Sequence, residues 1–209
     1  MTILESVQTK LNNEIQLIGE ECVEKGNCTI IIGVVHGDEP QGKFLINNFL
    51  EQNEIPKNLL FVPSLNPDGL ELETRTNANE IDINRNFPTN NWVLGEKNRY
   101  FGGEKPNSEI ETKFIINVIE KYAPKLIITL HTPFKIVNFD GEAQDISEKI
   151  AQIFNYPVEA SIGYPTPGSF GTWAGLERNI PIITIEMDEE CPQEELIKPF
   201  EKMIEYLSK

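Results

Sequence analysis

Two histidines and a glutamate, side-chain types that bind zinc, follow apolar segments of the sequence. His36 comes directly after the apolar run at 29–35, and Glu39 stands three positions later. His131, the only other histidine, follows the run at 125–130. A single histidine at the end of a strand is more often structural than catalytic. With Glu39, however, the two imidazoles make the set of three protein ligands that is typical of catalytic zinc, with a fourth position left for water.

Apolar runs of strand length alternate along the chain with amphipathic segments of helix length. We predict strands at 14–19, 29–35, 59–65, 125–130 and 180–187, and helices at 41–52, 108–122, 145–155 and 193–209. Several of the strand runs are continuously apolar, which indicates strands covered on both faces. We therefore expect an α/β fold, with a mixed, mostly parallel sheet flanked by helices on both faces, and one catalytic domain over residues 1–209.

The elements of such a fold would bring the candidate ligands together. Loops at the carboxyl ends of the strands of an α/β sheet converge on one crevice, and both histidines stand at such ends. A capping box of Ser108 and Glu111 is expected to begin the second helix. The segment from Asn66 to Lys105 shows little regular period, and a long irregular segment in a compact domain is usually functional.

The composition argues against two classes of partner. Eighteen lysines and arginines against 33 aspartates and glutamates give a net charge of −15, which repels nucleic acid phosphates and anionic lipids. No apolar run approaches the roughly 20 residues needed to cross a bilayer, and the first residues lack the basic region and cleavage site of a secretory signal. We expect a cytoplasmic protein that binds neither nucleic acid nor membrane.

The irregular segment adds further residues to the metal-binding pattern. The pattern comprises His36-x-x-Glu39, Arg75, the run DINRNFP at 82–88, His131 and the run Thr-Ile-Glu that ends at Glu186. Through these residues the sequence resembles the zinc carboxypeptidase family over roughly residues 29–188. It departs from the family at Glu80, where a glycine is usual, and the chain is shorter than most members.

The resemblance implies a metal centre and a proton-transfer residue. His36, Glu39 and His131 would bind one zinc ion per chain, and Asp82 would fix the orientation of a ligand histidine. Glu186 would accept a proton from the attacking water and pass it to the departing amine.

The remaining matched residues would bind the substrate. Arg75 would stabilise the charge that develops on the scissile carbonyl oxygen. Asn84 and Arg85 would hold the free carboxylate of the terminal residue, because a guanidinium matches a carboxylate with two parallel hydrogen bonds. Tyr164 stands before Glu186 at the interval that the family uses for a mobile capping tyrosine. Together these roles define an exopeptidase.

Within the family, the sequence is most similar to members that act on murein peptides, through stretches such as NPDG at 66–69 and SIGYPTPGSFGTW at 161–173. This implies hydrolysis of the γ-D-glutamyl bond to a carboxyl-terminal meso-diaminopimelate in a small peptide. The residues that recognise diaminopimelate stay unassigned, with Ser169 and Thr172 as candidates. Three alternatives remain open: another zinc carboxypeptidase specificity, an N-acyl amino acid deacylase, and an inactive peptide-binding module. The oligomeric state is also open.

Overall fold

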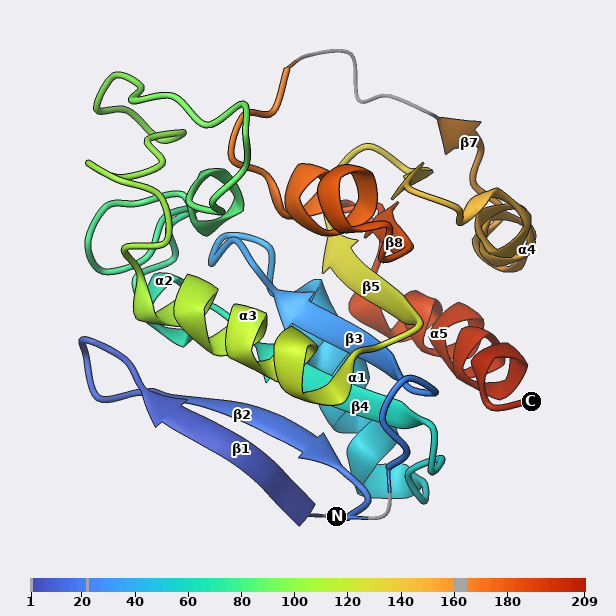
Figure 1. Ribbon diagram of the computed structural model, residues 1–209. Coiled ribbons are helices and arrows are strands. Elements are labelled where there is room, and N and C mark those ends of the chain that lie inside the picture. The colour runs from blue at the N-terminus through green and yellow to red at the C-terminus, as the bar shows by residue number, and fades with distance from the viewer. Residues whose placement is uncertain (1, 22, 160–164) are drawn as a thin grey trace.

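The computed structural model describes residues 2–21, 23–159 and 165–209. Within these residues a single sheet runs through the molecule (Figure 1). Its strands are β1 (Thr2–Gln8), β2 (Glu14–Gly19), β3 (Thr29–Val34), β4 (Leu59–Ser64), β5 (Leu126–His131), β6 (Ile136–Asp140), β7 (Val158–Glu159) and β8 (Ile182–Glu186). Their spatial order is β1-β2-β4-β3-β5-β8-β6-β7.

The centre of this sheet is parallel and its flanks are mixed. β3 pairs in parallel with β4 and β5, and β5 pairs in parallel with β8. Towards the edges, β2 runs antiparallel to β1 and β4, and β6 runs antiparallel to β8. The central strands are the continuously apolar runs of the sequence. Their side chains are buried on both faces of the sheet. The predicted mixed sheet is confirmed.

Helices cover both faces, as expected (Figure 1). They are α1 (Gln41–Gln52), α2 (Pro67–Glu71), α3 (Ile110–Tyr122), α4 (Gln144–Phe154) and α5 (Gln193–Leu207), with a short 3-10 helix η1 (Ile83–Arg85) and a π-helical turn η2 (Thr172–Leu176). Ile31 packs in the cluster formed with α1, α4 and α5, whereas its neighbours Ile30 and Ile32 pack in the cluster formed with α3 and η2. No helix of the described residues is long and apolar enough to span a membrane.

The predicted capping box at the start of α3 is wrong. The N-cap residue is Glu109, and it makes no side-chain cap bond. Ser108 Oγ instead donates to Glu109 Oε1 at 2.6 Å, and Glu111 Oε2 accepts from Asn77 Nδ2 at 3.2 Å. Ser108 and Glu111 therefore form hydrogen bonds with the side chains of Glu109 and Asn77, and these bonds do not form the reciprocal pair of a capping box.

This arrangement buries Glu111 and predicts a pH effect on stability. Burial raises the pKa of Glu111 from 4.5 to about 7, although the hydrogen bond from Asn77 acts in the opposite direction. Between these pH values the folded protein keeps a proton that the unfolded chain releases, so the free energy of unfolding falls as pH rises. The loss is complete above pH 7 and amounts to at most about 3 kcal/mol.

Glu111→Gln should remove this loss, because glutamine does not ionise. The difference in unfolding free energy between the variant and the parent should therefore grow in the variant's favour from pH 4.5 to pH 8, measured by urea denaturation. Glu120→Gln, at an exposed position of the same helix, is the matched control. A difference that does not change with pH would contradict the assignment.

Glu80 lies in a turn of the irregular segment. Its φ is 61°, in the left-handed region that glycine adopts most easily. Glu80 N donates to Asn77 O at 2.9 Å, and Asn77 N donates to Ile81 O at 2.9 Å, which closes the turn. This backbone conformation explains why a glycine suits the position at which the sequence departs from the family.

Candidate active site

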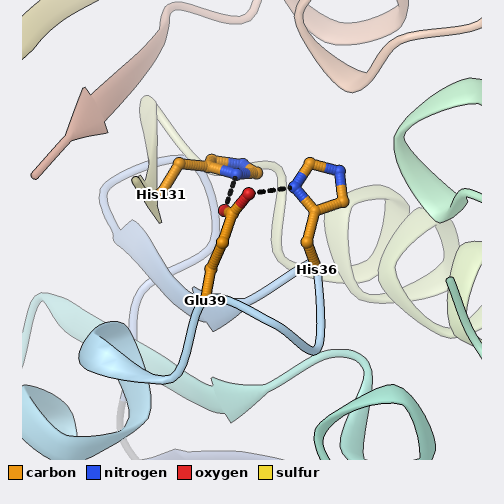
Figure 2. Close-up of side chains that lie close together, drawn as sticks. All are labelled: His36, Glu39 and His131. Carbon is orange, nitrogen blue, oxygen red and sulfur yellow. Dashed lines mark hydrogen bonds and ion pairs between the residues drawn. The ribbon is translucent and has the colours of Figure 1, made fainter. Parts of the chain in front are cut away.

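Three buried side chains converge at the carboxyl ends of β3 and β5, as Figure 2 shows. Glu39 Oε1 lies 2.9 Å from His36 Nδ1, and Glu39 Oε2 lies 2.7 Å from His131 Nδ1. One donor atom of each residue lies within 4.8 Å of the others. Two imidazole nitrogens and a carboxylate oxygen in a buried cluster make a donor set that suits zinc. The structure thus brings the three predicted ligands together.

The electrostatics of this cluster favour a positive charge. Burial alone would raise the pKa of Glu39, but the two histidines hold it well below its ordinary value. Burial lowers the pKa of His131. Burial would also lower the pKa of His36, yet the charges of Glu39 and Asp82 raise it to about 9. Two ionised carboxylates therefore stabilise a cation here, whether it is a proton on His36 or a metal ion.

Asp82 connects the cluster to Arg75. Its fully buried carboxylate places Oδ1 3.3 Å from His36 Nε2, while Oδ2 accepts from Arg75 Nε at 2.9 Å. The same carboxylate caps η1 by accepting from Asn84 N at 2.9 Å. Arg75 Nη1 lies 3.7 Å from Glu39 Oε1, so the guanidinium is fixed beside the candidate ligands. This position suits the expected role of Asp82 in orienting His36 through Nε2.

Glu186 is the last residue of β8 and lies beside His131 in the pairing of β8 with β5. Burial, and then the charge of Glu39, raises its pKa to about 8. No described residue hydrogen-bonds to its Oε2 atom, and no salt bridge to it occurs in the described part of the chain. The carboxyl group is in contact with the backbone of Phe134 but has no ion-pair partner among the described residues. A buried carboxyl of this kind is a candidate for proton transfer, and its environment argues against a structural ion pair.

Asn84 and Arg85, the predicted carboxylate clamp, lie together on η1. Asn84 Oδ1 accepts from Phe170 N at 2.8 Å, and Arg85 Nη1 donates to Asn84 O at 2.7 Å. Both side chains line the same cavity as the candidate ligands. The loop that precedes η2 therefore fixes the orientation of the Asn84 side chain, and the Arg85 guanidinium is held against the Asn84 backbone.

The backbone of Arg85 is enclosed by two glycines. A Cβ atom on Gly102 would lie 2.3 Å from Arg85 O, and one on Gly168 would lie 2.2 Å from it. Trp92 Nε1 donates to the same carbonyl oxygen at 3.1 Å. Only glycine allows this close approach of three segments, because any side chain would overlap the carbonyl.

One cavity of about 500 Å³ joins the ligand cluster to Arg75, Asn84, Arg85 and Glu186. Groups that could bind a metal, transfer a proton and hold a carboxylate therefore face a common space, large enough for the end of a peptide. Tyr164 lies outside the described residues. Thr166, which follows it closely in the sequence, lines the cavity.

The cavity wall also contains residues that sequence reasoning did not single out. They include Asp38, Arg99 and Tyr100 from loops, and Asn138, Asp140 and Thr184 from the sheet. Ser169, one of the candidates for substrate recognition, lines the cavity and donates to Thr172 Oγ1 at 3.0 Å. Of these residues, Thr184 could have been predicted from the alternation of side chains along a strand. It stands two residues before Glu186 and therefore lies on the same face of the sheet.

Comparison with known proteins agrees with this geometry. A family model described as zinc carboxypeptidase matches residues 23–144. The chain is similar to murein peptide amidase A of Vibrio campbellii, with 34% identity over 180 residues that cover 79% of this chain and 71% of that protein. It is also similar to murein peptide amidase A of Escherichia coli K12, with 34% identity over 170 residues that cover 75% of this chain and 69% of that protein.

Solved structures give the same result for the fold. The murein-tripeptide amidase MpaA from Escherichia coli O157 superposes with a TM-score of 0.86 and 29% identity, covering 97% of this chain and 90% of that one. Carboxypeptidase A from Helicoverpa armigera superposes with a TM-score of 0.71 at 15% identity, covering 99% of this chain and 68% of that one. The second similarity concerns the fold alone.

Proposed function

Because this chain belongs to the zinc carboxypeptidase family, we propose that it is a zinc-dependent amidase that hydrolyses the γ-D-glutamyl bond to a carboxyl-terminal meso-diaminopimelate in murein peptides. The observation that carries the proposal is the single cavity shared by the ligand cluster, Glu186 and Arg85. The choice of murein peptides rests on the relatives that are murein peptide amidases.

In this mechanism, Arg85 and Asn84 bind the free carboxylate of the terminal residue. A charge-assisted, bidentate contact fixes the peptide end and places the preceding amide bond beside Glu186. Requiring a free carboxylate makes the enzyme an exopeptidase. Tyr164 is assigned the role of capping the bound residue from the family resemblance.

The reacting amide lies between the ligand cluster and Glu186. His36, Glu39 and His131 would hold one zinc ion, which when bound polarises the scissile carbonyl and makes water more acidic. Glu186 takes a proton from the attacking water and returns it to the departing nitrogen.

Arg75 complements the developing negative charge in this reaction. Its guanidinium donates to the carbonyl oxygen as charge builds up there. Asp82 keeps both Arg75 and His36 in place through its two carboxylate oxygens. A single buried carboxylate thus positions the oxyanion donor and a metal ligand.

The proposal includes the setting of the reaction. We place it in the cytoplasm, with a small peptide as the partner and with neither nucleic acid nor membrane involved, consistent with the net charge of −15. Residues 1–209 would form one catalytic domain, because the strands of the described residues belong to one sheet.

The direct test is to incubate zinc-loaded protein, in separate reactions, with L-Ala-γ-D-Glu-meso-diaminopimelate, with an all-L, α-linked tripeptide and with an N-acetylated amino acid, and to detect released amines. We expect hydrolysis of the murein tripeptide. Cleavage of only the α-linked peptide would favour another carboxypeptidase specificity, and cleavage of only an N-acyl amino acid would favour a deacylase. A protein that binds peptide without metal and hydrolyses nothing would be a binding module.

Arg85→Ala should lower kcat/KM by on the order of 100-fold or more, because the lost charge-assisted contact positions the scissile bond. In the parent, converting the terminal carboxylate of the substrate to an amide should have a similar effect. In the variant the same conversion should have little further effect, because the partner is already gone. Steady-state kinetics of both proteins on both peptides measure this coupling. Equal turnover of free and amidated peptides by the parent would show that the enzyme is not an exopeptidase.

A further inference from the structure

The active-site face of the sheet continues inward from Glu186. Thr184 and Ile182 share this face with Glu186, because alternate residues of a strand point to the same side. In the antiparallel pairing of β8 with β6, Asn138 lies beside Thr184 and Asp140 lies beside Ile182. Asp140 is therefore two rows deeper than Glu186 on the same face, and it lines the same cavity.

The Asp140 carboxylate occupies a space that two glycines of the η2 region leave open. A Cβ atom on Gly171 would lie 2.1 Å from Asp140 Oδ2, and one on Gly175 would lie 2.4 Å from Asp140 Cβ. Burial raises the pKa of the Asp140 carboxyl. Among the residues that the structure describes, none forms a hydrogen bond or an ion pair with this carboxylate.

Two fully buried aspartates of the described residues, Asp68 and Asp82, have protein partners. Asp68 accepts from Leu11 N at 3.0 Å and from Asn13 Nδ2 at 3.0 Å, and Asp82 accepts from Arg75. Removing a carboxylate from water without compensation is unfavourable, so such groups are normally paired. A partly buried, unpartnered Asp140 in a cavity wall is best explained by a partner that arrives with the substrate.

We propose that Asp140 determines specificity for the side chain of the released residue, by binding an ammonium group at the end of that side chain. The substrate class is then a peptide with a carboxyl-terminal diamino acid, which includes meso-diaminopimelate and lysine. This inference rests on the proposed function, because the Arg85 clamp decides which residue enters the cavity beyond Glu186.

The distance of Asp140 from Glu186 also determines which length of substrate side chain is preferred. Four residues along a strand, from Glu186 to Ile182, span roughly 13 Å. A four-carbon side chain and the Asp140 side chain together bridge most of this distance, whereas a one-carbon side chain does not. Long diamino acids should therefore be preferred over 2,3-diaminopropionate.

The test uses γ-D-glutamyl peptides that differ only in the terminal residue: meso-diaminopimelate, L-lysine, L-norleucine and L-2,3-diaminopropionate. Norleucine has the carbon chain of lysine without the ammonium. The parent should show a lysine-to-norleucine ratio of kcat/KM on the order of 100. Asp140→Asn should bring this ratio close to 1, mainly by raising KM for the lysine peptide. Asp145→Asn, at an exposed position with the same change of charge, is the control and should keep the parental ratio.

A second variant tests the geometry if Asp140→Asn folds poorly. Gly171→Ala keeps the carboxylate but displaces it, because the added methyl overlaps Asp140 Oδ2. It should lower the same ratio. Melting temperatures of both variants separate loss of specificity from loss of structure.

The outcomes also distinguish this inference from the proposed function. Hydrolysis of γ-linked peptides with equal kcat/KM for lysine and norleucine would overturn the role of Asp140 and leave the proposed function standing. The same conclusion would follow if Asp140→Asn lowered kcat/KM equally for both peptides. Hydrolysis of only α-linked peptides, with a ratio that depends on Asp140, would refute the function and support the inference. If neither linkage is hydrolysed, calorimetry with free L-lysine and L-norleucine decides: Asp140-dependent preference for lysine supports the inference, and equal affinity overturns it.

Discussion

Glu186→Gln is expected to lower kcat by a factor on the order of 100 to 10,000 while zinc content stays unchanged. Glutamine keeps the shape of the side chain but cannot accept a proton from the attacking water. Substrate affinity should survive, because Arg85 and Asn84 are untouched. Thermal stability should not fall, since no ion pair with Glu186 exists among the described residues. Melting temperature, zinc content and kcat on one preparation check these statements together.

The control for this variant is Glu190→Gln, which makes the same change at a nearby exposed position and should keep parental turnover. A purely structural Glu186 predicts the opposite pattern: an early melting transition with near-parental kcat per folded molecule. That result would remove Glu186 from the mechanism, although the metal site and the carboxylate clamp would remain.

His131→Ala should abolish both zinc binding and activity. Only His36 and Glu39 would remain as protein ligands, and two ligands do not retain zinc through purification. Elemental analysis should find about one zinc per chain in the parent and far less in the variant. The parent should also melt at a lower temperature after chelation, because zinc binds the folded state, whereas the variant should not respond.

Two further variants test whether a change in zinc content is specific to the three candidate ligands. Cys191→Ser removes a free thiol that is not part of the cluster, and it should keep full zinc content. Asp82→Asn leaves all three ligands but weakens the contact to His36, so zinc affinity should fall by about 10- to 100-fold. Full occupancy in His131→Ala would refute the assignment of the site.

The sequence predicted the elements whose cores are locally apolar. The bounds of α1 and β2 match the predicted segments at 41–52 and 14–19, and the central strands differ by one or two residues at their ends. β1 and β6 were missed, since their residues alternate between partly buried and exposed or carry polar groups. β7, with two residues, has no periodic signal at all.

The same distinction holds for the site. The candidate ligands could be named from the sequence because a histidine at a strand end and a glutamate three positions later are local features, and the structure brings them together. Asp140 could not be placed, because its position in the cavity depends on the pairing of β6 with β8. The wrong capping box has a similar cause: Asn77, far away in sequence, reaches the carboxylate of Glu111.

The close packing of Gly102, Gly168 and Trp92 around the Arg85 carbonyl has a consequence for refolding. Gly168 lies far from Arg85 along the chain, so this contact closes a long loop, and such contacts form more slowly than helices and short turns. A refolding chain would therefore regain its helical circular dichroism before Arg85 is positioned to bind the terminal carboxylate of a peptide. Peptidase activity would recover with a lag, and the length of that lag would report the docking of the 165–171 loop.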